Sequence, residues 1–266
     1  MTEYIHGFWL AFLQGVTEFL PISSSGHLVL VPKLLGWPDQ GLAFDVAVHV
    51  GSLIAVVLYF RRDLLRLVVD WWRSVTGGPT TAYSRLAWAI VVATIMVGVT
   101  GLLLEDFINA SLRSPIPVAI ATFVFALFLW WSDVAGKKQR SIEQIGWLDV
   151  LMIGAAQMLA LIPGTSRSGV TITTGLAMGL TREAAARFSF LLAIPVISLA
   201  GFWQGRSLIQ AEESANWGLL LFSTFVSAVV AFVCIHWFLD FLRRFSMLPF
   251  VIYRLFIALL LFWVFR

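Results

Sequence analysis

The sequence predicts an all-α polytopic membrane protein with six full spans, two re-entrant helical hairpins and an inverted-topology internal repeat. The first observation is composition: of 266 residues, 59% are hydrophobic and 12% are charged, whereas soluble domains are about 25% charged. The second observation is that apolar runs of roughly 20 residues, the length that crosses a bilayer, recur along the chain. The third is that two apolar regions are interrupted by similar polar breaks. These observations predict a single membrane domain over residues 1–266.

Six apolar runs have the length of a membrane span. They cover about residues 41–60, 85–104, 116–133, 185–204, 217–239 and 248–265. The stretch 73-RSVTGGPTTAYS-84 reads as an exposed loop because it contains Gly-Gly-Pro together with several serines and threonines. Cys234 lies inside a span, where we expect it to be a small packing residue.

Two further regions, 5–36 and 147–180, are apolar but broken. Each has a helix-length piece, then proline and small polar residues over 21–26 or 163–169, then a second short piece. A half-length apolar segment beside a polar break indicates a re-entrant hairpin. Broken backbone at membrane depth is tolerated only where protein or a wet cavity surrounds it. We therefore expect both breaks to be enclosed by the protein.

The two broken regions also match each other in sequence. At a constant offset, 22-ISSSGHLVLVPKLLG-36 lies over 165-TSRSGVTITTGLAMG-179. Each half of the chain, about residues 1–135 and 145–266, would then hold one hairpin and three spans. Because three is odd, the halves would enter from opposite faces, and the site would lie near the midplane where the broken helices meet. A chance likeness between two helical segments is the alternative.

The basic residues indicate the orientation, because Lys and Arg are more frequent in cytoplasmic loops. If the 61–85 segment is cytoplasmic, that side holds Arg61, Arg62, Arg66, Arg73, Arg85, Lys137, Lys138, Arg140, Arg182, Arg187, Arg243 and Arg244. The opposite side holds Lys33, Arg113, Arg206 and Arg266. This bias predicts that both termini lie outside.

Gln14 and Glu18 are the first polar residues whose presence at membrane depth requires an explanation. An ionised side chain there costs roughly 2.5–3.5 kcal/mol on insertion scales, so those that persist are usually paired and functional. Four residues apart, the two share one face of a helix that Pro21 helps to end. One carboxylate and one amide oxygen beside a wet pocket suit a hard divalent cation that keeps several waters. A Gln–Glu hydrogen bond that solvates the helix end is the alternative.

A serine-rich turn opens the second helical piece. Its members are Ser23, Ser24, Ser25 and Gly26. Such a turn presents free backbone N–H groups and a positive dipole end to an anion, although plain N-capping is the alternative. The matching stretch 163-PGTSRSG-169 adds Arg167, whose planar fork of donors suits phosphate. Two helix N-termini, an arginine and a carboxylate predict a site for a phosphate–metal pair, with a buried Arg–Glu salt bridge as the alternative.

Histidines and a second arginine complete the set of polar residues. His27 adjoins the serine turn, so it is a candidate nucleophile on phosphorus, or a base or acid for Ser24 or a water, with a packed histidine as the alternative. Asp45 and His49 are four residues apart near the outer end of a span, where we expect an interfacial or packing role. Arg254 lies a few residues inside the last span, so we expect it to snorkel to the cytoplasmic edge or to pair locally.

The combination of 14-QGVTEFLPISSSGH-27 with 163-PGTSRSGVT-171 resembles the bacterial undecaprenyl-diphosphate phosphatase family, of the bacitracin-resistance type. The resemblance extends along nearly the whole chain, including 188-FSFLLAIP-195 and 249-PFVIYR-254. It implies an enzyme of the bacterial cytoplasmic membrane that hydrolyses undecaprenyl diphosphate to the monophosphate and phosphate, which recycles the lipid carrier for peptidoglycan. It also implies re-entrant helices in an inverted repeat, a divalent cation, a site reached from the outer face and a homodimer.

Carried over by position, the resemblance places Gln14 and Glu18 on the metal-associated pair and Ser24 and His27 on two competing nucleophile candidates. Gln14 stands where some members have Glu, so Glu18 must carry more of any metal binding. We expect in-line attack on the terminal phosphorus by Ser24, with His27 or Glu18 as base, or by His27 directly. A Mg²⁺ or Ca²⁺ ion near Glu18 would neutralise charge. The phosphates would be bound by Ser23, Ser25, Gly26, Ser166, Arg167, Ser168 and Thr171.

Two other functions remain open from the sequence. A polyprenyl-phosphate transporter or flippase would share inverted repeats, broken helices and midplane charges. A second lipid phosphatase superfamily has a Pro-Ser-Gly-His stretch that 24-SSGH-27 echoes, but its downstream Ser-Arg-x-x-x-His pattern has no counterpart here. The expected partners are the lipid substrate and membrane lipid, and no nucleic acid is expected.

Overall fold

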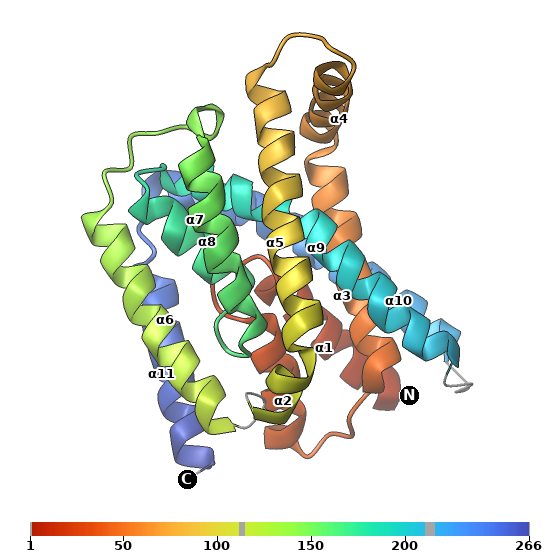
Figure 1. The fold of residues 1–266 in the computed structure, drawn as a ribbon. Helices are drawn as coiled ribbons and strands as arrows, with labels where there is room; N and C mark the ends of the chain where they lie inside the picture. The colour runs from red at the N-terminus through yellow and green to blue at the C-terminus, as the bar shows by residue number, and fades with distance from the viewer. Residues whose placement is uncertain (1, 112–114, 211–215, 266) are drawn as a thin grey trace.

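The chain folds into a bundle of α-helices, shown in Figure 1. The computed structural model describes residues 2–111, 115–210 and 216–265, and over these residues it contains eleven α-helices, two short 3-10 helices and no named strand. Arg113 and Arg266, two of the basic residues used to predict the orientation, lie outside the described residues. The all-α prediction is confirmed.

Five of the described helices are long and apolar enough to cross a membrane, which confirms a multi-pass membrane protein. They are α3 (Gly41–Tyr59), α5 (Ala82–Ser111), α6 (Pro115–Ala135), α9 (Arg182–Gln210) and α10 (Trp217–Arg244). The sixth predicted span corresponds to α11 (Leu248–Val264), a shorter apolar helix of 17 residues that packs against α6. Both chain ends lie toward the same end of the bundle (Figure 1).

The two predicted broken regions each contain two helices separated by a break. In the first region α1 (Thr2–Thr17) is followed by α2 (Ser24–Leu35), and in the second α7 (Trp147–Met158) is followed by a 3-10 turn (Leu159–Leu161) and then by α8 (Arg167–Ala177). In both regions the residue just before the second helix has a positive φ, 75° at Ser23 and 69° at Ser166. Non-glycine residues rarely adopt such angles, and they cluster at functional sites.

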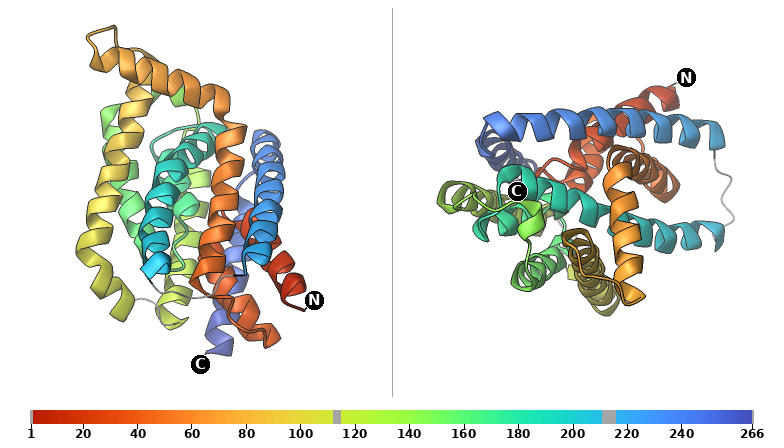
Figure 2. Two further views of the ribbon diagram at one scale, coloured as in Figure 1. Left: turned by 90° about the vertical axis from the view of Figure 1, so that its right-hand side faces the viewer. Right: turned by 90° about the horizontal axis from the view of Figure 1, so that it is seen from above.

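One helix was not expected. The segment after α3 forms α4 (Arg61–Val75), which runs across the end of the bundle from α3 to α5, as the left view of Figure 2 shows. The predicted loop over 73–84 is therefore wrong at both ends, because α4 continues to Val75 and α5 begins at Ala82. The arginines of α4 lower its mean hydropathy, so a search for apolar runs passes over an amphipathic helix.

Small residues let α3 and α10 approach closely. A Cβ atom added at Gly51 of α3 would lie 2.4 Å from the Thr224 carbonyl oxygen of α10, so no larger residue fits there. The hydroxyls of Ser52 and Ser227 lie 3.1 Å apart at the same crossing. Glycine and serine at a crossing, with hydroxyls bonded across it, are typical of helix pairs packed within membranes.

Helix α9 is the central element that positions the first break. It packs against α3, α5, α8 and α10. Its Phe190 is buried edge-on against Phe19, the residue after Glu18, with ring centroids 5.2 Å apart.

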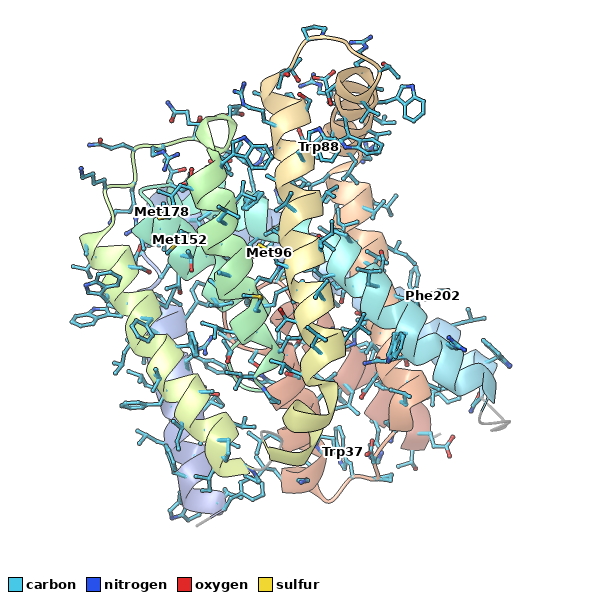
Figure 3. All side chains as sticks on the ribbon, in the orientation of Figure 1. Trp37, Trp88, Met96, Met152, Met178 and Phe202 are labelled. Atoms are coloured by element: carbon cyan, nitrogen blue, oxygen red, sulfur yellow. The ribbon has the colours of Figure 1, made fainter. Side chains whose placement is uncertain are left out.

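At the periphery, Trp37 and Trp88 lie at opposite ends of the bundle (Figure 3), as expected for tryptophans at the two membrane interfaces.

Candidate functional site

The two breaks in the helices lie against each other inside the bundle. The Ser168 hydroxyl of α8 donates a 2.8 Å hydrogen bond to the carbonyl of Leu20, in the first break. The second break passes close to α6, because a Cβ added at Gly164 would lie 2.4 Å from the Val118 carbonyl oxygen. Gly164 also has a φ of 90°, so both the space and the backbone require glycine here. The expectation that protein encloses the breaks holds for these residues.

Arg254 of α11 joins the two breaks. Its side chain is fully buried, and its guanidinium donates to the carbonyl of Pro21 at 3.2 Å and to those of Gly164 and Thr165 at 3.1 and 2.9 Å. It also donates to the Thr122 carbonyl at 3.4 Å. Of the two expectations for Arg254, snorkelling to the cytoplasmic edge is wrong, and its pairing is inside the protein with groups that are distant in the sequence. Three of the carbonyls that it binds, those of Pro21, Gly164 and Thr165, lie in the two breaks, where the backbone is not hydrogen-bonded within a helix.

Glu18 is the centre of the site. One carboxylate oxygen, Oε2, accepts a 2.7 Å hydrogen bond from the Ser24 hydroxyl and a 3.0 Å bond from the Gln14 amide. The other, Oε1, accepts a 2.8 Å charge-assisted bond from Arg167. The side chain is almost buried, so the arginine offsets a charge that would be costly on its own. The Gln14–Glu18 hydrogen bond and the Arg167–Glu18 salt bridge, which the sequence left open as the alternatives to a metal site and a phosphate site, are both present in the structure.

Ser24 and Arg167 are the first residues of α2 and α8. At that position the backbone N–H groups have no partner within the helix, and the helix dipole favours an anion. The Arg167 guanidinium is held in place by a second bond of 3.2 Å to the Ser189 carbonyl of α9. The carboxylate of Glu18 thus lies between the leading residues of two facing short helices.

The other predicted phosphate-binding hydroxyls already have partners inside the protein. The Ser166 hydroxyl accepts from the Gly169 N–H and caps α8, and Ser168 is bonded to Leu20 as described. Thr171 donates to the Arg167 carbonyl at 2.8 Å. In the first break the hydroxyls of Ser23 and Ser25 lie 3.4 Å apart, and Gly26 follows them in the first turn of α2. Among the predicted phosphate-binding residues of the second break, Arg167 is the one whose side chain reaches Glu18.

His27 is directed away from Ser24. Its Nδ1 lies 2.7 Å from the Ser23 carbonyl oxygen, and its Nε2 lies 2.6 Å from the Tyr253 hydroxyl of α11. The two rings are stacked, and the imidazole is buried. Both ring nitrogens are therefore engaged, Nδ1 at the start of α2 and Nε2 in a contact that ties α2 to α11. This arrangement matches the packed-histidine alternative.

A cavity of about 190 Å³ opens beside Glu18 and Arg167. Its polar wall includes His49 and Gln157, and much of the rest is apolar. The apolar lining is provided by Val46, Val97, Ala160, Leu161, Val196, Ile197 and Ala200. A charged end beside an apolar remainder suits a ligand with a polar head and a hydrocarbon part.

The sequence interpretation missed two residues of this cavity. His49 was expected at the interface or in packing, but its Nε2 lies 3.7 Å from Glu18 Oε2, and its Nδ1 lies 2.7 Å from the Asp45 carbonyl oxygen. Gln157 of α7 is fully buried, and it donates to the Ala93 carbonyl at 3.2 Å while its Oε1 has no partner. A signal for Gln157 was present, because it follows Gln14 by 143 residues, the same offset that separates Ser166 from Ser23.

A divalent cation beside Glu18 would have few charged ligands. Among the described residues there is no group of three or more His, Cys, Asp or Glu side chains placed to hold a metal. Gln14 nevertheless has a buried Oε1 without a partner, while its Nε2 donates to Glu18. A carboxylate and one or two amide oxygens fit a hard cation that keeps several waters and takes its remaining ligands from a phosphate. Gln14, Glu18 and Gln157 are the residues that fit this role.

The chain was compared with known protein families and curated proteins. The family described as bacitracin resistance protein BacA matches residues 7–260. An undecaprenyl-diphosphatase of Nitrosococcus oceani is 53% identical over 263 residues, which is 99% of each chain. Proteins with the same name from Chromohalobacter salexigens and Thioalkalivibrio sulfidiphilus are each 54% identical, over 98% and 96% of this chain and 99% and 97% of their own.

Proposed function

The chain belongs to the bacitracin resistance protein BacA family, and from that premise we propose that it is an integral membrane phosphatase that hydrolyses undecaprenyl diphosphate. The products are undecaprenyl phosphate and inorganic phosphate, which returns the lipid carrier to cell-wall synthesis. The single observation that carries the proposal is the Glu18 carboxylate, which accepts hydrogen bonds from both Ser24 and Arg167 beside the cavity. A hydroxyl bonded to a carboxylate is the arrangement that activates a nucleophile.

Binding of the diphosphate rests on charge. Arg167 and the N-termini of α2 and α8 supply N–H donors around the Glu18 carboxylate. Phosphoryl transfer depends mainly on such positioning and on electrostatic stabilisation. When the phosphate arrives, it competes with Glu18 for the Arg167 guanidinium. That competition frees the carboxylate to act as a base. The apolar part of the cavity receives the first isoprene units of the tail.

The first chemical step is in-line attack by Ser24. Its Oγ forms a bond to the terminal phosphorus while the bond from that phosphorus to the bridging oxygen breaks. The bridging oxygen leaves as part of undecaprenyl phosphate, and the Ser24 proton passes to Glu18 at the 2.7 Å contact. This step leaves a phosphoserine.

The second step regenerates the enzyme. Glu18 releases its proton with the first product and then takes one from a water molecule that attacks the phosphoserine. The Ser24–phosphorus bond breaks, inorganic phosphate leaves, and the proton returns from Glu18 to the Ser24 oxygen. Glu18 thus serves as base and acid in turn. Direct attack by His27 is the less favoured route, because both of its ring nitrogens are held by other groups.

A divalent cation, Mg²⁺ or Ca²⁺, forms part of the proposal. Glu18 and the free amide oxygen of Gln14 would hold it, with Gln157 as a further candidate ligand. Bound there, it would neutralise charge on the phosphates and stabilise the departing monophosphate. Because Gln14 carries no charge, Glu18 supplies the negative ligand.

The finer architecture is also proposed. We infer six spans plus two re-entrant hairpins related by an inverted repeat, with halves of about 1–135 and 145–266, both termini outside the cytoplasmic membrane, and a homodimer. The paired breaks with positive φ at Ser23 and Ser166, the shared offset of Gln14 and Gln157, and the position of both chain ends toward one end of the bundle support this topology.

The proposed activity is tested by phosphate release from undecaprenyl diphosphate by the purified protein in detergent, with and without EDTA. We expect release that falls on chelation and returns with Mg²⁺ or Ca²⁺. No release under any metal condition, from protein that elutes as a single folded species, would overturn the proposal. In that case transport of labelled undecaprenyl phosphate across vesicles would test the flippase alternative, which needs no hydrolysis.

A further inference from the structure

Helix α4 presents one face to the bundle and leaves the other uncovered. It lies across the end of the bundle, where α3 ends and α5 begins (Figure 2). On its inner face Leu67 is buried, and Trp71 lies 5.7 Å from Trp88 of α5, measured between ring centroids. Asp70 accepts a 2.6 Å hydrogen bond from Thr81 at the start of α5. These contacts fix how the helix is rotated about its axis.

The outer face of α4 carries an apolar stripe. Its five members are between 46% and 67% exposed, and they recur at intervals of three or four residues, as one side of a helix requires. They are Leu65, Val68, Val69, Trp72 and Val75. Five large apolar side chains on one side of one short helix form a patch of the kind that marks an interaction surface.

A basic stripe lies beside the apolar one. Arg62, Arg66 and Arg73 are exposed, and at 3.6 residues per turn their Cα positions fall within about 40° of one another around the helix axis. Of the two acidic residues of α4, Asp63 is bonded to Arg187, while Asp70 accepts a hydrogen bond from Thr81 and lies 3.9 Å from the Arg73 guanidinium. The outer surface therefore consists of an apolar strip with a cationic edge, and Arg61 is exposed at the first position of the helix, where it donates to the Leu58 carbonyl.

We propose that α4 lies in the plane of the membrane interface, with its apolar stripe among the acyl chains and its arginines on the headgroups of anionic phospholipids. A helix with one apolar face and an arginine-rich polar face binds at that depth. The patch is continuous with a membrane-facing surface, because Val57 and Leu58 at the end of α3 are also exposed. A second copy of the chain is a poorer occupant, because pairing two such faces would bring their arginines together.

The depth of α4 is tested with a single fluorophore on the full-length protein in lipid nanodiscs. In a Cys234→Ser background, bimane is attached at Val68→Cys on the stripe or, as the matched control, at Thr80→Cys in the exposed loop beyond the helix. Acyl-chain-brominated phosphatidylcholine should quench position 68 at least about threefold more than position 80. Aqueous iodide should show the opposite order.

Two results would overturn this placement. If iodide quenches position 68 as well as it quenches position 80, and brominated lipid does not, then α4 faces water. If both quenchers fail at position 68 and a bifunctional reagent links two such cysteines, a second copy covers the face. Phosphate release, measured on the same samples, verifies that each variant is folded, since neither position belongs to the site.

The proposed preference of α4 for anionic phospholipids is tested separately. Brominated phosphatidylglycerol should quench position 68 about twofold or more above brominated phosphatidylcholine, because each arginine near the surface attracts anionic lipid. The ratio should fall to one in the triple variant Arg62→Gln, Arg66→Gln, Arg73→Gln. Equal quenching by the two lipids in the unsubstituted protein would overturn the assignment of anionic headgroups.

Discussion

Ser24 donates a 2.7 Å hydrogen bond to Glu18 across the break between α1 and α2. The contact joins the end of one short helix to the first residue of the next. It orients the Ser24 hydroxyl and provides an acceptor for its proton. The same carboxylate is held from the other half of the chain by Arg167, so the proposed nucleophile, the proposed base and the arginine form one connected unit. Each member of this unit can be tested separately.

Replacing Ser24 by Ala should lower kcat for phosphate release by at least about 10³-fold, because removal of an attacking group leaves only binding and electrostatic stabilisation. Ser25→Ala is the matched control, since Ser25 is exposed in the same turn and contacts Ser23 instead of Glu18. Its activity should fall far less than that of Ser24→Ala, because the Ser24–Glu18 contact remains.

The chemistry of the trapped intermediate distinguishes Ser24 from His27. Rapid quenching with ³²P-labelled substrate should give an acid-stable, base-labile phosphoenzyme, as phosphoserine requires. An acid-labile, base-stable phosphoenzyme that persists in Ser24→Ala would transfer the role to His27.

Arg167→Met should both abolish turnover and destabilise the fold. The pair with Glu18 is largely shielded from solvent, and removal of one partner from a buried pair leaves an uncompensated charge that costs up to about 3–5 kcal/mol. Thermal unfolding in detergent should therefore show a lower midpoint for Arg167→Met. The double variant Glu18→Gln, Arg167→Met should regain most of the midpoint without regaining activity. A double variant as unstable as the single one would mean that Arg167 acts through its bond to the Ser189 carbonyl.

The central site was predictable from the sequence because its signals are local. Gln14 and Glu18 are one helical turn apart, the serine turn follows a proline, and the second broken stretch supplies Arg167 at a matching offset. The likeness of two such stretches indicates that they meet, even though the sequence says nothing of distances. The family resemblance added the chemistry.

The residues that the sequence did not reveal depend on packing between distant helices. His49 faces Glu18 only because α3 lies beside α1, and a histidine near a helix end gives no sign of this. Arg254 has the sequence position of a snorkelling arginine, but the carbonyls that bind it come from three separate segments. Helix α4 was missed because amphipathic helices lack the apolar run that identifies a span.

Arg254→Met should destabilise the protein by about 3 kcal/mol or more, because several buried carbonyls lose their donors at once. The midpoint of thermal unfolding reports this loss. Arg254→Lys should recover only part of it, since one ammonium cannot reach the positions spanned by a guanidinium. Arg244→Gln, an exposed arginine at the end of α10, is the control and should leave the midpoint within error. A wild-type midpoint in Arg254→Met would show that the two breaks hold together without it.

Gln14→Glu should strengthen cation binding at the site. The new carboxylate would lie one helical turn from Glu18, and two negative ligands hold a hard divalent ion better than one carboxylate with a neutral amide. We expect the Mg²⁺ concentration for half-maximal activity to fall by about tenfold, or about 1.4 kcal/mol of binding free energy. Direct Mn²⁺ binding, followed by electron paramagnetic resonance, should tighten in parallel. Gln14→Leu, which removes the amide oxygen while keeping its bulk, should raise the required Mg²⁺ concentration. If Gln14→Glu and Gln14→Leu both leave the Mg²⁺ dependence and the Mn²⁺ affinity unchanged, the unpartnered oxygen of Gln14 is not a metal ligand.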